Sequence, residues 1–470
     1  MIPVVVLQFL RQETAVPLQL ARGTAIAPPI LRPTRLQERS SAAQSWDAAL
    51  NVAAHETCEP AMSRIAILHP TDPVGHVPGG IDSFIKGILK WAPDDLEYTL
   101  FGATSDPLKR PRGRAMSVTL GARTFDFVPI VPVLPSSARS RIPLTVRYMW
   151  ELGRRLGSGQ FAAFDVLDFH RIEPALLFRA DARPKNIFLH TDRAAIRSPH
   201  SSVMWRHWPA LYERLEARAF ATTDRVFSVS RSAVESYSSV YSRFAQRFIY
   251  TPTWVDPETF HPIADARERN RLRAQLLETL NAPAGSRLLV FVGRLEREKN
   301  PAMLLEAFCM ASATHESLHL IVIGDGSLRP EVDAMCRRKE LRGRVSLLGV
   351  QRAQDIAGIL QVSDLFVLSS DFEGMPIAVL EALATGVPVV STDVGELSAI
   401  VQDGITGRLS KNKSSTALSN AIRTALNELS IIQGKPCVMA AARYHPAIIL
   451  SQIYENHRRQ CTVPDHLSGA

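Results

Sequence analysis

Two glutamates with seven residues between them are the first candidates for chemistry in this chain of 470 residues. Glu373 and Glu381 lie in the segment 369–391, SSDFEGMPIAVLEALATGVPVVS. A carboxylate can accept hydrogen bonds from vicinal hydroxyl groups, such as those of a sugar or a ribose. Taken alone, each glutamate is more simply a solvated loop or surface-helix residue. The chemical interpretation therefore depends on the elements that hold them.

A strand, a loop, a helix and a second strand are expected around these glutamates. Residues 365–368 are a short apolar run, and residues 369–375 form a turn before Pro376, whose fixed φ suits the first position of a helix. Residues 376–384 have helical periodicity, and residues 387–391 resume as a buried strand. The loop then lies at the carboxyl end of a strand, where open parallel sheets bind their ligands.

The two glutamates are expected to have different roles. Glu373 lies in the loop with Gly374, Met375 and Pro376. There, its carboxylate and the free N–H groups of the helix start can face a bound sugar and phosphate. Glu381 lies two turns into the helix, where it can accept hydrogen bonds from a ribose.

A second strand-to-helix turn carries positive charge. Residues 288–292 predict a strand, and the turn after it, GRLEREKN, contains Gly293, Arg294 and Lys299 before a helix at residues 301–309. Two cations beside a helix start can bind a diphosphate. The alternative is that both side chains are simply solvated.

The segment EGMPIAVLEALATGVPVV resembles the signature segment of glycosyltransferase family 4, the retaining sugar-nucleotide-dependent transferases of GT-B fold. The resemblance implies an α/β fold in which two Rossmann-like doubly wound domains face each other across a cleft. It implies that Glu373 lies beside the donor-sugar hydroxyls and that Glu381 contacts the ribose. It also assigns Arg294 and Lys299 to the donor diphosphate and places Val350, in the turn after the strand at 345–349, beside the nucleobase.

The first half of the chain opens with a similar unit. Residues 64–68 predict a strand, Gly79 and Gly80 form a glycine pair, and residues 81–91 predict an amphipathic helix. A glycine pair alone can be no more than a tight turn. The resemblance implies that this pair lies near the donor phosphates and the acceptor.

Two successive strands of this half end in histidine. His170 closes the strand predicted at residues 164–170, and His190 closes the strand at 186–190. Both side chains are expected at the crevice of a parallel sheet, although one such histidine is more often structural than catalytic. By resemblance, His170 lines the reaction centre as a catalytic residue, and His190 matches a less uniformly functional position.

The sequence departs from the family pattern at two places. Thr253 and Trp254 stand where the family usually has Asn-Gly before Val-Asp, which leaves the backbone geometry of that linker open. Glu396 replaces the usual second glycine in the turn DVGE.

Composition and pattern predict two domains with extensions. We expect residues 1–61 to be a disordered extension, 62–262 an N-terminal acceptor-side domain and 263–440 a C-terminal donor-nucleotide domain. Residues 441–470 are expected to form a helix that crosses back to the first domain, followed by a tail. The five cysteines are scattered and predict neither a disulfide nor a zinc site.

The net charge of +8 suits anionic partners such as sugar nucleotides, lipid phosphates or membrane surfaces. A basic helix expected at residues 139–157 can lie on an anionic membrane, but the favoured interpretation is that its apolar side packs on the sheet. The basic residues are dispersed and no nucleic-acid recognition motif occurs, so nucleic acid is not the expected partner.

The expected function is retaining transfer of a sugar, of hexosyltransferase type, from a UDP-, GDP- or ADP-sugar to a glycan, lipid-linked or small-molecule hydroxyl. No Asp-any-Asp pair occurs to hold a metal, so we expect no cofactor and assign the positive charge to Arg294, Lys299 and helix starts. The resemblance implies a cytoplasmic protein, either free or attached to the inner face of the membrane. The alternatives are a sugar-nucleotide epimerase and a non-catalytic nucleic-acid-binding protein.

Overall fold

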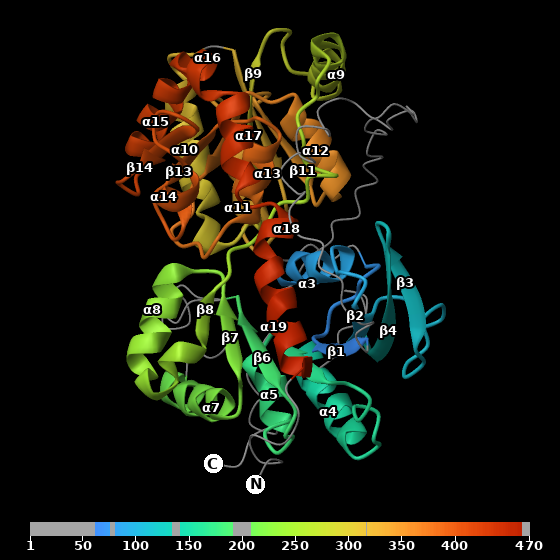
Figure 1. Ribbon diagram of the computed structural model, residues 1–470. Coiled ribbons are helices and arrows are strands. Elements are labelled where there is room, and N and C mark those ends of the chain that lie inside the picture. Colours follow the sequence, from blue (N-terminus) through green and yellow to red (C-terminus); the bar gives the residue numbers. More distant parts are fainter. Residues whose placement is uncertain (1–61, 76–79, 134–141, 191–207, 316, 463–470) are drawn as a thin grey trace, which may run out of the picture.

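The computed structural model describes residues 62–75, 80–133, 142–190, 208–315 and 317–462 (Figure 1). The described chain contains two sheets, each covered by helices, stacked as an upper and a lower unit in Figure 1. We call the unit built on the first sheet the first domain and the other the second domain. The predicted α/β class with two Rossmann-like doubly wound domains is confirmed. The domain limits expected at residues 262 and 440 remain predictions.

The first sheet has the strand order β3-β4-β2-β1-β5-β6-β7-β8. Its strands are β1 (Ser63–Leu68), β2 (Leu96–Thr104), β3 (Met116–Leu120), β4 (Arg123–Pro132), β5 (Val166–Phe169), β6 (Lys185–Leu189), β7 (Arg225–Ser228) and β8 (Phe248–Tyr250). Neighbouring strands are parallel except in the hairpin of β3 and β4. Strand order reverses between β1 and β5, so the loops that follow these two strands open at the switch point of the sheet.

The second sheet has the order β11-β10-β9-β12-β13-β14, and the strand pairs are all parallel. Its strands are β9 (Arg287–Val292), β10 (Leu318–Ile323), β11 (Val345–Gly349), β12 (Leu365–Leu368), β13 (Val389–Thr392) and β14 (Gly407–Ser410). The switch point lies between β9 and β12, which pair directly. The two loops that carry Lys299 and Glu373 therefore leave the sheet side by side.

Helices cover both faces of each sheet, and this explains why the strands are continuous apolar runs. In β1, Ile65 and Ile67 belong to one core cluster, whereas Ala66 and Leu68 belong to the other. The helices of the first domain are α3 (Gly80–Lys90), α4 (Leu144–Leu156), α5 (Ile172–Leu177), α7 (Pro209–Ala221) and α8 (Arg231–Val240).

The helices of the second domain alternate with its strands as far as β14, after which α15, α16 and α17 follow one another. They are α9 (Ala266–Thr279), α10 (Pro301–Ser312), α11 (Arg329–Cys336), α12 (Ala353–Gln361), α13 (Ile377–Ala384), α14 (Leu397–Ile400), α15 (Ser415–Asn427), α16 (Leu429–Ile432) and α17 (Lys435–Ala442). Several expected boundaries differ from the observed ones by one to three positions. At the loop of Glu373, Pro376 is the N-cap of α13, with φ −74° and ψ 112°, and the helix begins at Ile377.

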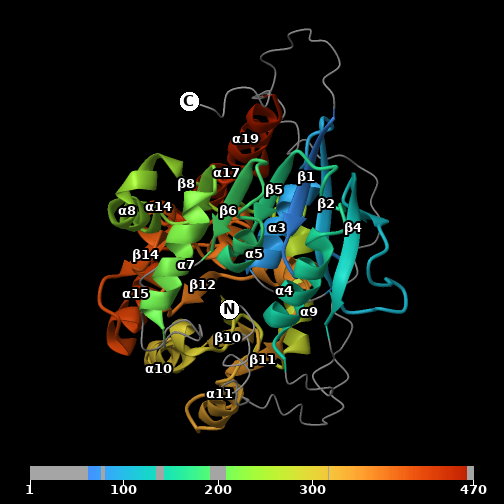
Figure 2. The ribbon, with the colours of Figure 1, turned by 90° about the horizontal axis from the view of Figure 1, so that it is seen from below.

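Two short segments connect the domains. The linker after β8 and the segment before α18 (Pro446–Ile449) meet where the Val255 N–H donates to the carbonyl of Tyr444 at 3.1 Å. The last helix, α19 (Ser451–Thr462), then lies along the first sheet, on the side away from α7 (Figure 2). The C-terminal segment of the chain therefore returns to the first domain and packs on its sheet.

A buried polar cluster attaches α19 to the first sheet. His457 Nε2 lies 2.9 Å from Asp168 Oδ2, and neither side chain is exposed to solvent. His457 Nδ1 is 2.9 Å from the hydroxyl of Tyr98. The other oxygen of Asp168 accepts from Asn186 Nδ2 at 2.9 Å, and the Asn186 amide also pairs with Gln460. The register of α19 is thus specified mainly by buried side chains, with the partly exposed Gln460 at the edge of the cluster.

Parts of the expected organisation lie outside the described residues, including residues 1–61 and the start of the helix expected at 139–157. In its described part that helix is α4, and its Tyr148 and Leu152 are buried in the sheet core, as the favoured interpretation predicted. Within the described ranges, no helix is long and apolar enough to cross a membrane.

We predict that Asp168→Ala destabilises the first domain by about 3 to 5 kcal/mol, because it leaves buried polar groups of His457 and Asn186 without their partner. The measurement is the free energy of urea unfolding. The matched control is Asp95→Ala. Asp95 is the half-exposed partner of Arg458, which lies on α19, and its loss should lower the free energy of unfolding by at most about 1 kcal/mol. Equal effects of the two substitutions would contradict a special role for the buried cluster.

Candidate active site

The loops after β9 and β12 are joined by an ion pair between two of the predicted site residues. Lys299 Nζ donates to Glu373 Oε1, with the two side chains only 17% and 9% exposed. The same carboxylate oxygen accepts from the hydroxyl of Ser370 at 2.6 Å. The structure therefore brings Lys299 and Glu373 together, at the switch point where the sequence predicted a site.

Backbone contacts hold the two loops in this arrangement. Ser369 Oγ donates to the carbonyl of Lys299 at 2.8 Å, and the Asp371 N–H donates to the carbonyl of Glu298 at 2.9 Å. Asn300 adopts a left-handed conformation, with φ 45°, and its side chain caps α10 by accepting from the Met303 N–H. The Asn300 cap therefore fixes the start of α10 next to the loop that carries Lys299.

Arg294 lies on the same loop but points to solvent. Its guanidinium donates to Glu298 Oε1 at 2.7 Å, and the side chain is 62% exposed. It is not part of the Lys299–Glu373 pair. A surface ion pair of this kind is weak, so the guanidinium can exchange Glu298 for a diphosphate at small cost.

The glycines of this region allow close backbone approach. A Cβ atom on Gly324, whose φ is +137°, would lie 1.9 Å from the carbonyl oxygen of Gly293. The Leu295 N–H donates to the carbonyl of Asp325 at 2.9 Å. The turn at 324–326, Gly-Asp-Gly, therefore packs against the loop that carries Gly293 and Arg294.

Glu381 and Val350 occupy the positions that the sequence predicted for them. Glu381 lies on α13 and is partly exposed, and burial, together with the charge of Asp256, raises its pKa from 4.5 to about 7. Val350 follows Gly349, which has φ +67°, and half of its surface is exposed. These positions leave both residues accessible from solvent.

Three histidines meet at the switch point of the first sheet. His69, His170 and His190 follow β1, β5 and β6, and His170 Nδ1 is 3.1 Å from His190 Nε2. His170 stacks on Phe188 with 4.5 Å between ring centroids. Its Nε2 is buried and has no hydrogen-bond partner among the described residues. His170 and His190, predicted separately, therefore form one unit that contains a buried nitrogen without a partner among the described residues.

These histidines are neutral at physiological pH. Burial lowers the pKa of His170 well below its usual value, and the nearby His190 and His69 add to this effect. Burial alone lowers the pKa of His190 to about 3. For His69, whose Nδ1 lies 2.6 Å from the hydroxyl of Thr71, burial and then Arg171 lower the pKa. The unit is therefore polar but supplies no positive charge.

The unusual Trp254 packs against Phe84, which borders the histidine unit. Its ring lies 4.3 Å from that of Phe84, which in turn lies 4.9 Å from His190. A Cβ atom on Gly87 of α3 would come within 2.2 Å of Trp254 Nε1, so the tryptophan fits only because that residue is glycine. The departure from Asn-Gly is thus accommodated by a compensating small residue.

The loop of Glu373 touches the first domain next to this tryptophan. The N–H of Thr253 donates to the sulfur of Met375 at 3.2 Å. A Cβ atom on Gly374 would lie 3.7 Å from a methyl carbon of Val229. The two halves of the site are therefore in contact through Gly374 and Met375, on one side, and Val229 and Thr253, on the other.

Other predicted features are not assembled in this way. Gly79 lies outside the described residues, and Gly80 is the exposed first residue of α3. Across the described ranges, no group of three or more His, Cys, Asp or Glu side chains could hold a metal ion. The expectation of metal independence stays a prediction.

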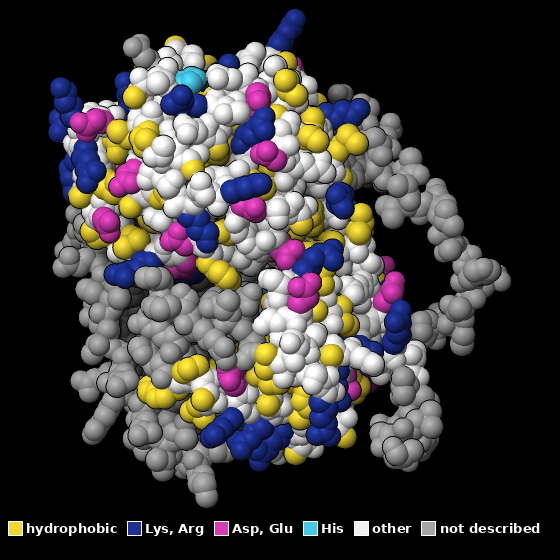
Figure 3. Space-filling view, turned by 90° about the vertical axis from the view of Figure 1, so that its left-hand side faces the viewer, with side chains coloured by type: hydrophobic (Ala, Val, Ile, Leu, Met, Phe, Trp, Pro, Cys, Tyr) yellow, Lys and Arg dark blue, Asp and Glu magenta, His cyan; other side chains and the backbone are white. Residues whose placement is uncertain are grey.

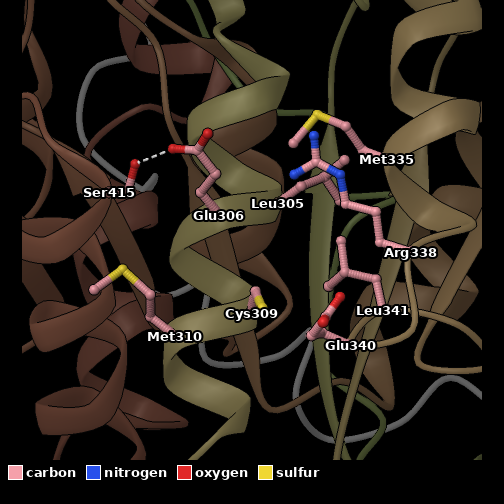
Figure 4. Close-up of a pocket in the computed structure, with 9 residues that line it drawn as sticks. All are labelled: Leu305, Glu306, Cys309, Met310, Met335, Arg338, Glu340, Leu341 and Ser415. Carbon is pink, nitrogen blue, oxygen red and sulfur yellow. Dashed lines mark hydrogen bonds between the residues drawn. The ribbon is translucent and has the colours of Figure 1, made fainter.

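A groove of about 550 Å³ lies elsewhere, between α10 and α11 on the second domain (Figure 4). Leu305, Cys309 and Met335 contribute to its lining, together with Glu306, which accepts from Ser415 at 2.6 Å. None of the predicted site residues lines it, so it is separate from the candidate site.

Sequence reasoning missed three contributors to the site. His69 stands directly after the first strand, a position that could have been recognised in the same way as His170 and His190. Ser370 precedes Glu373 by three residues and carries no signal of its own. Glu396 was noticed only as a departure, but its carboxylate reaches the first domain, where it accepts from the Arg231 N–H at 2.6 Å.

Comparison with known proteins identifies the second domain. Residues 273–431 match the family described as "Glycosyl transferases group 1". A D-inositol 3-phosphate glycosyltransferase of Corynebacterium urealyticum is 30% identical over 242 residues, which cover 49% of this chain and 54% of that protein. An alpha-1,3-galactosyltransferase of Escherichia coli that uses UDP-Gal is 26% identical over 58% of this chain and 70% of its own length. The chain thus spans about half the length of the first relatives, D-inositol 3-phosphate glycosyltransferases, that it matches.

Solved structures match over both domains. Sucrose-phosphate synthase from Thermosynechococcus elongatus has a TM-score of 0.68 at 19% identity, covering 84% of this chain and 98% of its own. HepE of Anabaena in complex with UDP-glucose has a TM-score of 0.63, also at 19% identity, covering 84% of this chain and 99% of its own. At these identities the likeness concerns the fold, which is GT-B. The second domain is therefore a Glycosyl transferases group 1 domain, and the resemblance of the chain to the retaining GT-B transferases of family 4 is confirmed.

Proposed function

We propose that this protein is a retaining glycosyltransferase that moves a hexose from a nucleotide sugar to a hydroxyl group of an acceptor. The observation that carries the proposal is the buried Lys299–Glu373 pair at the switch point of the second sheet, in contact with the loop that leads to Trp254 and the histidine unit. One side of the site is charged and suits a nucleoside diphosphate, whereas the other is neutral and suits a sugar.

The donor would lie along the carboxyl edge of the second sheet. Lys299, Arg294 and the start of α10 face the diphosphate, and Glu373 accepts hydrogen bonds from the sugar hydroxyls. Glu381 accepts from the ribose, and the turn at Val350 lies beside the base. Gly293, Gly374, Met375 and Pro376 contribute backbone surface to the same path.

Transfer breaks the bond between the anomeric carbon and the diphosphate oxygen. The acceptor oxygen bonds to that carbon on the same face, and its proton passes to the leaving diphosphate. Arg294 and Lys299 stabilise the negative charge that develops on the leaving group, an effect of preorganised electrostatics. His170 is neutral, which keeps positive charge on the diphosphate side, and its buried Nε2 would hydrogen-bond with the sugar only after the side chains that bury it move aside.

The acceptor is a glycan, a lipid-linked sugar or a small polyol. Similarity to transferases that act on D-inositol 3-phosphate and on GlcNAc-diphosphoundecaprenol supports hydroxylated acceptors with phosphate nearby. The net charge of +8 suits both classes. A cytoplasmic setting in polysaccharide biosynthesis remains an expectation.

A sugar-nucleotide epimerase remains the enzymatic alternative, since it could use the same cleft. The two differ in when free nucleotide is released, which for a transferase depends on an acceptor. Nucleic-acid binding has less support. On the face seen in Figure 3, Lys and Arg alternate with Asp and Glu over the second domain, and no continuous basic field crosses it.

Nucleotide binding tests the donor assignment. We predict by calorimetry that the protein binds one of the UDP-, GDP- or ADP-sugars saturably, and that Glu381→Ala weakens binding at least tenfold, about 1.4 kcal/mol. Affinity for the wild type should rise from pH 6 to pH 8. Glu381 has a pKa of about 7, and its ionised form is the stronger acceptor for ribose hydroxyls.

The control for this titration is Glu381→Gln, which has no charge to lose and should show a flat pH dependence. Nucleotide sugars are used because a free terminal phosphate ionises near pH 6 and would add its own dependence. Absence of binding by any of the three donors would count against the proposed function.

Loss of a cation at the diphosphate should abolish practical turnover. We predict that Arg294→Ala and Lys299→Ala each lower kcat by about 10² to 10³, because one preorganised charge contact is worth that much. Arg459→Ala removes a similar i,i+4 pair from α19 and should leave kcat unchanged.

Folding of these variants is checked by their thermal transition. The double variant Lys299→Ala/Glu373→Gln removes the buried charge that Lys299→Ala leaves behind, so comparing the thermal transitions of the two variants shows how much instability that charge causes. Turnover near that of the wild type in Arg294→Ala or Lys299→Ala would refute the assignment of that residue.

Contact with an anionic membrane is an additional expectation for α4. Its Trp150 is 67% exposed, and Leu108 on the neighbouring loop is 94% exposed, with Arg112 and Arg154 close in sequence. We predict that Trp150→Ala lowers co-sedimentation with anionic vesicles severalfold in low salt. Met439→Ala, which removes an exposed side chain of the second domain, should not. If neither substitution changed vesicle binding, this surface of α4 would be excluded as the membrane contact.

A further inference from the structure

The turn after β13 carries a carboxylate that crosses from the second domain to the first. Glu396 Oε1 accepts from the N–H of Arg231 at 2.6 Å, and the side chain is buried. Glu396 Oε2 lies 3.5 Å from the hydroxyl of Tyr250. Figure 1 shows α14, which begins just after Glu396, above α8, which begins at Arg231. The contact therefore bridges the two domains at one end of the cleft.

The receiving side of this contact is built for a negative charge. Arg231 is the first residue of α8, whose N-cap Ser230 accepts from the Ala233 N–H. A carboxylate at a helix start gains from both the free N–H group and the helix dipole. The Arg231 guanidinium lies over the ring of Tyr250 at 4.2 Å, which places a positive group beside the same carboxylate. Each partner holds the next in position.

The backbone of the same turn supports the donor loop. The N–H of Glu396 donates to the carbonyl of Gly374 at 3.1 Å. Gly395 has φ +56°, and a Cβ atom there would lie 2.2 Å from the carbonyl oxygen of Glu373. The turn thus lies directly against the peptide that carries Glu373. A shift of Glu396 relative to the first domain must move this peptide as well.

We propose that Glu396 is a positioning residue that couples closure of the two domains to the placement of the Glu373–Gly374 peptide. Its side chain binds the first domain through the Arg231 N–H. Its main chain holds the loop of Glu373 through the hydrogen bond to the carbonyl of Gly374. The glycine usual at this position in the family that the chain resembles has no side chain to make this contact. Only the expected effect on the donor KM rests on the proposed function; the expected effect on domain arrangement does not.

The experiment compares Glu396→Ala, Glu396→Gln and Glu396→Gly in two measurements. Small-angle X-ray scattering of the full chain without ligand reports domain arrangement, and steady-state kinetics separates the donor KM from kcat. A hydrogen bond to a charged group corresponds to roughly a ten- to hundredfold shift in the open-closed equilibrium. We expect a larger radius of gyration and a donor KM raised about tenfold for Ala and Gly, with kcat reduced less than threefold.

Glu396→Gln should fall between the wild type and Ala, because its amide oxygen can still accept from the Arg231 N–H but carries no negative charge. The matched control is Glu428→Ala, which removes a carboxylate paired with Arg408 within the second domain and should change neither quantity. If Glu396 acted only through its charge, Gln would behave as Ala does. If the substitutions damaged the turn itself, Ala and Gly would differ from each other.

The proposal is overturned if Glu396→Ala keeps both the radius of gyration and the donor KM of the wild type, or if Glu396→Gln behaves as Ala does. Scattering does not depend on turnover, so the two proposals fail separately. A wild type without transferase activity whose Ala variant still expands would overturn the proposed function and leave the coupling intact.

Discussion

The pairing of β9 with β12 is the constraint on which the rest of the site depends. Because these strands are hydrogen-bonded neighbours at the point where the strand order reverses, the loops that follow them must leave the sheet together. Lys299 and Glu373 are 74 residues apart in sequence and still form a buried ion pair. A buried pair is weak support for stability, since its desolvation offsets the attraction. Its presence at a ligand-binding edge is better explained by binding than by folding.

Charge is distributed unequally across the cleft, and the fold explains the asymmetry. On the second domain, loops between strand and helix leave cations and a helix start near solvent, where a diphosphate can replace their present partners. On the first domain, His69, His170 and His190 lie together at the switch point, and burial keeps all three neutral. In the proposed function, this asymmetry would orient a nucleotide sugar with its phosphates toward Arg294 and Lys299.

Local patterns were enough to predict the elements that carry the site, because each strand-loop-helix unit is encoded in about twenty consecutive residues. The strand, loop and helix around Glu373 are where the sequence predicted them, and the strands expected to end in His170 and His190 end one residue earlier, at Phe169 and Leu189. Pair contacts between distant segments could not be predicted in this way. The Lys299–Glu373 pair, the His170–His190 contact and the attachment of His457 to Asp168 depend on strand order and helix crossing, which no short segment specifies.

The two departures from the family pattern also show that the effect of a residue can depend on a distant partner, which a local sequence pattern does not identify. Trp254 is unusual as a sequence feature, but its meaning depends on Gly87, which is far away in the chain and makes room for the ring. Glu396 is likewise a single substitution until α8 is placed opposite it. In both cases a larger side chain at the domain boundary is matched by a partner in the first domain. Such matched pairs make the relative position of the two domains, and not only the loops, part of what this sequence specifies.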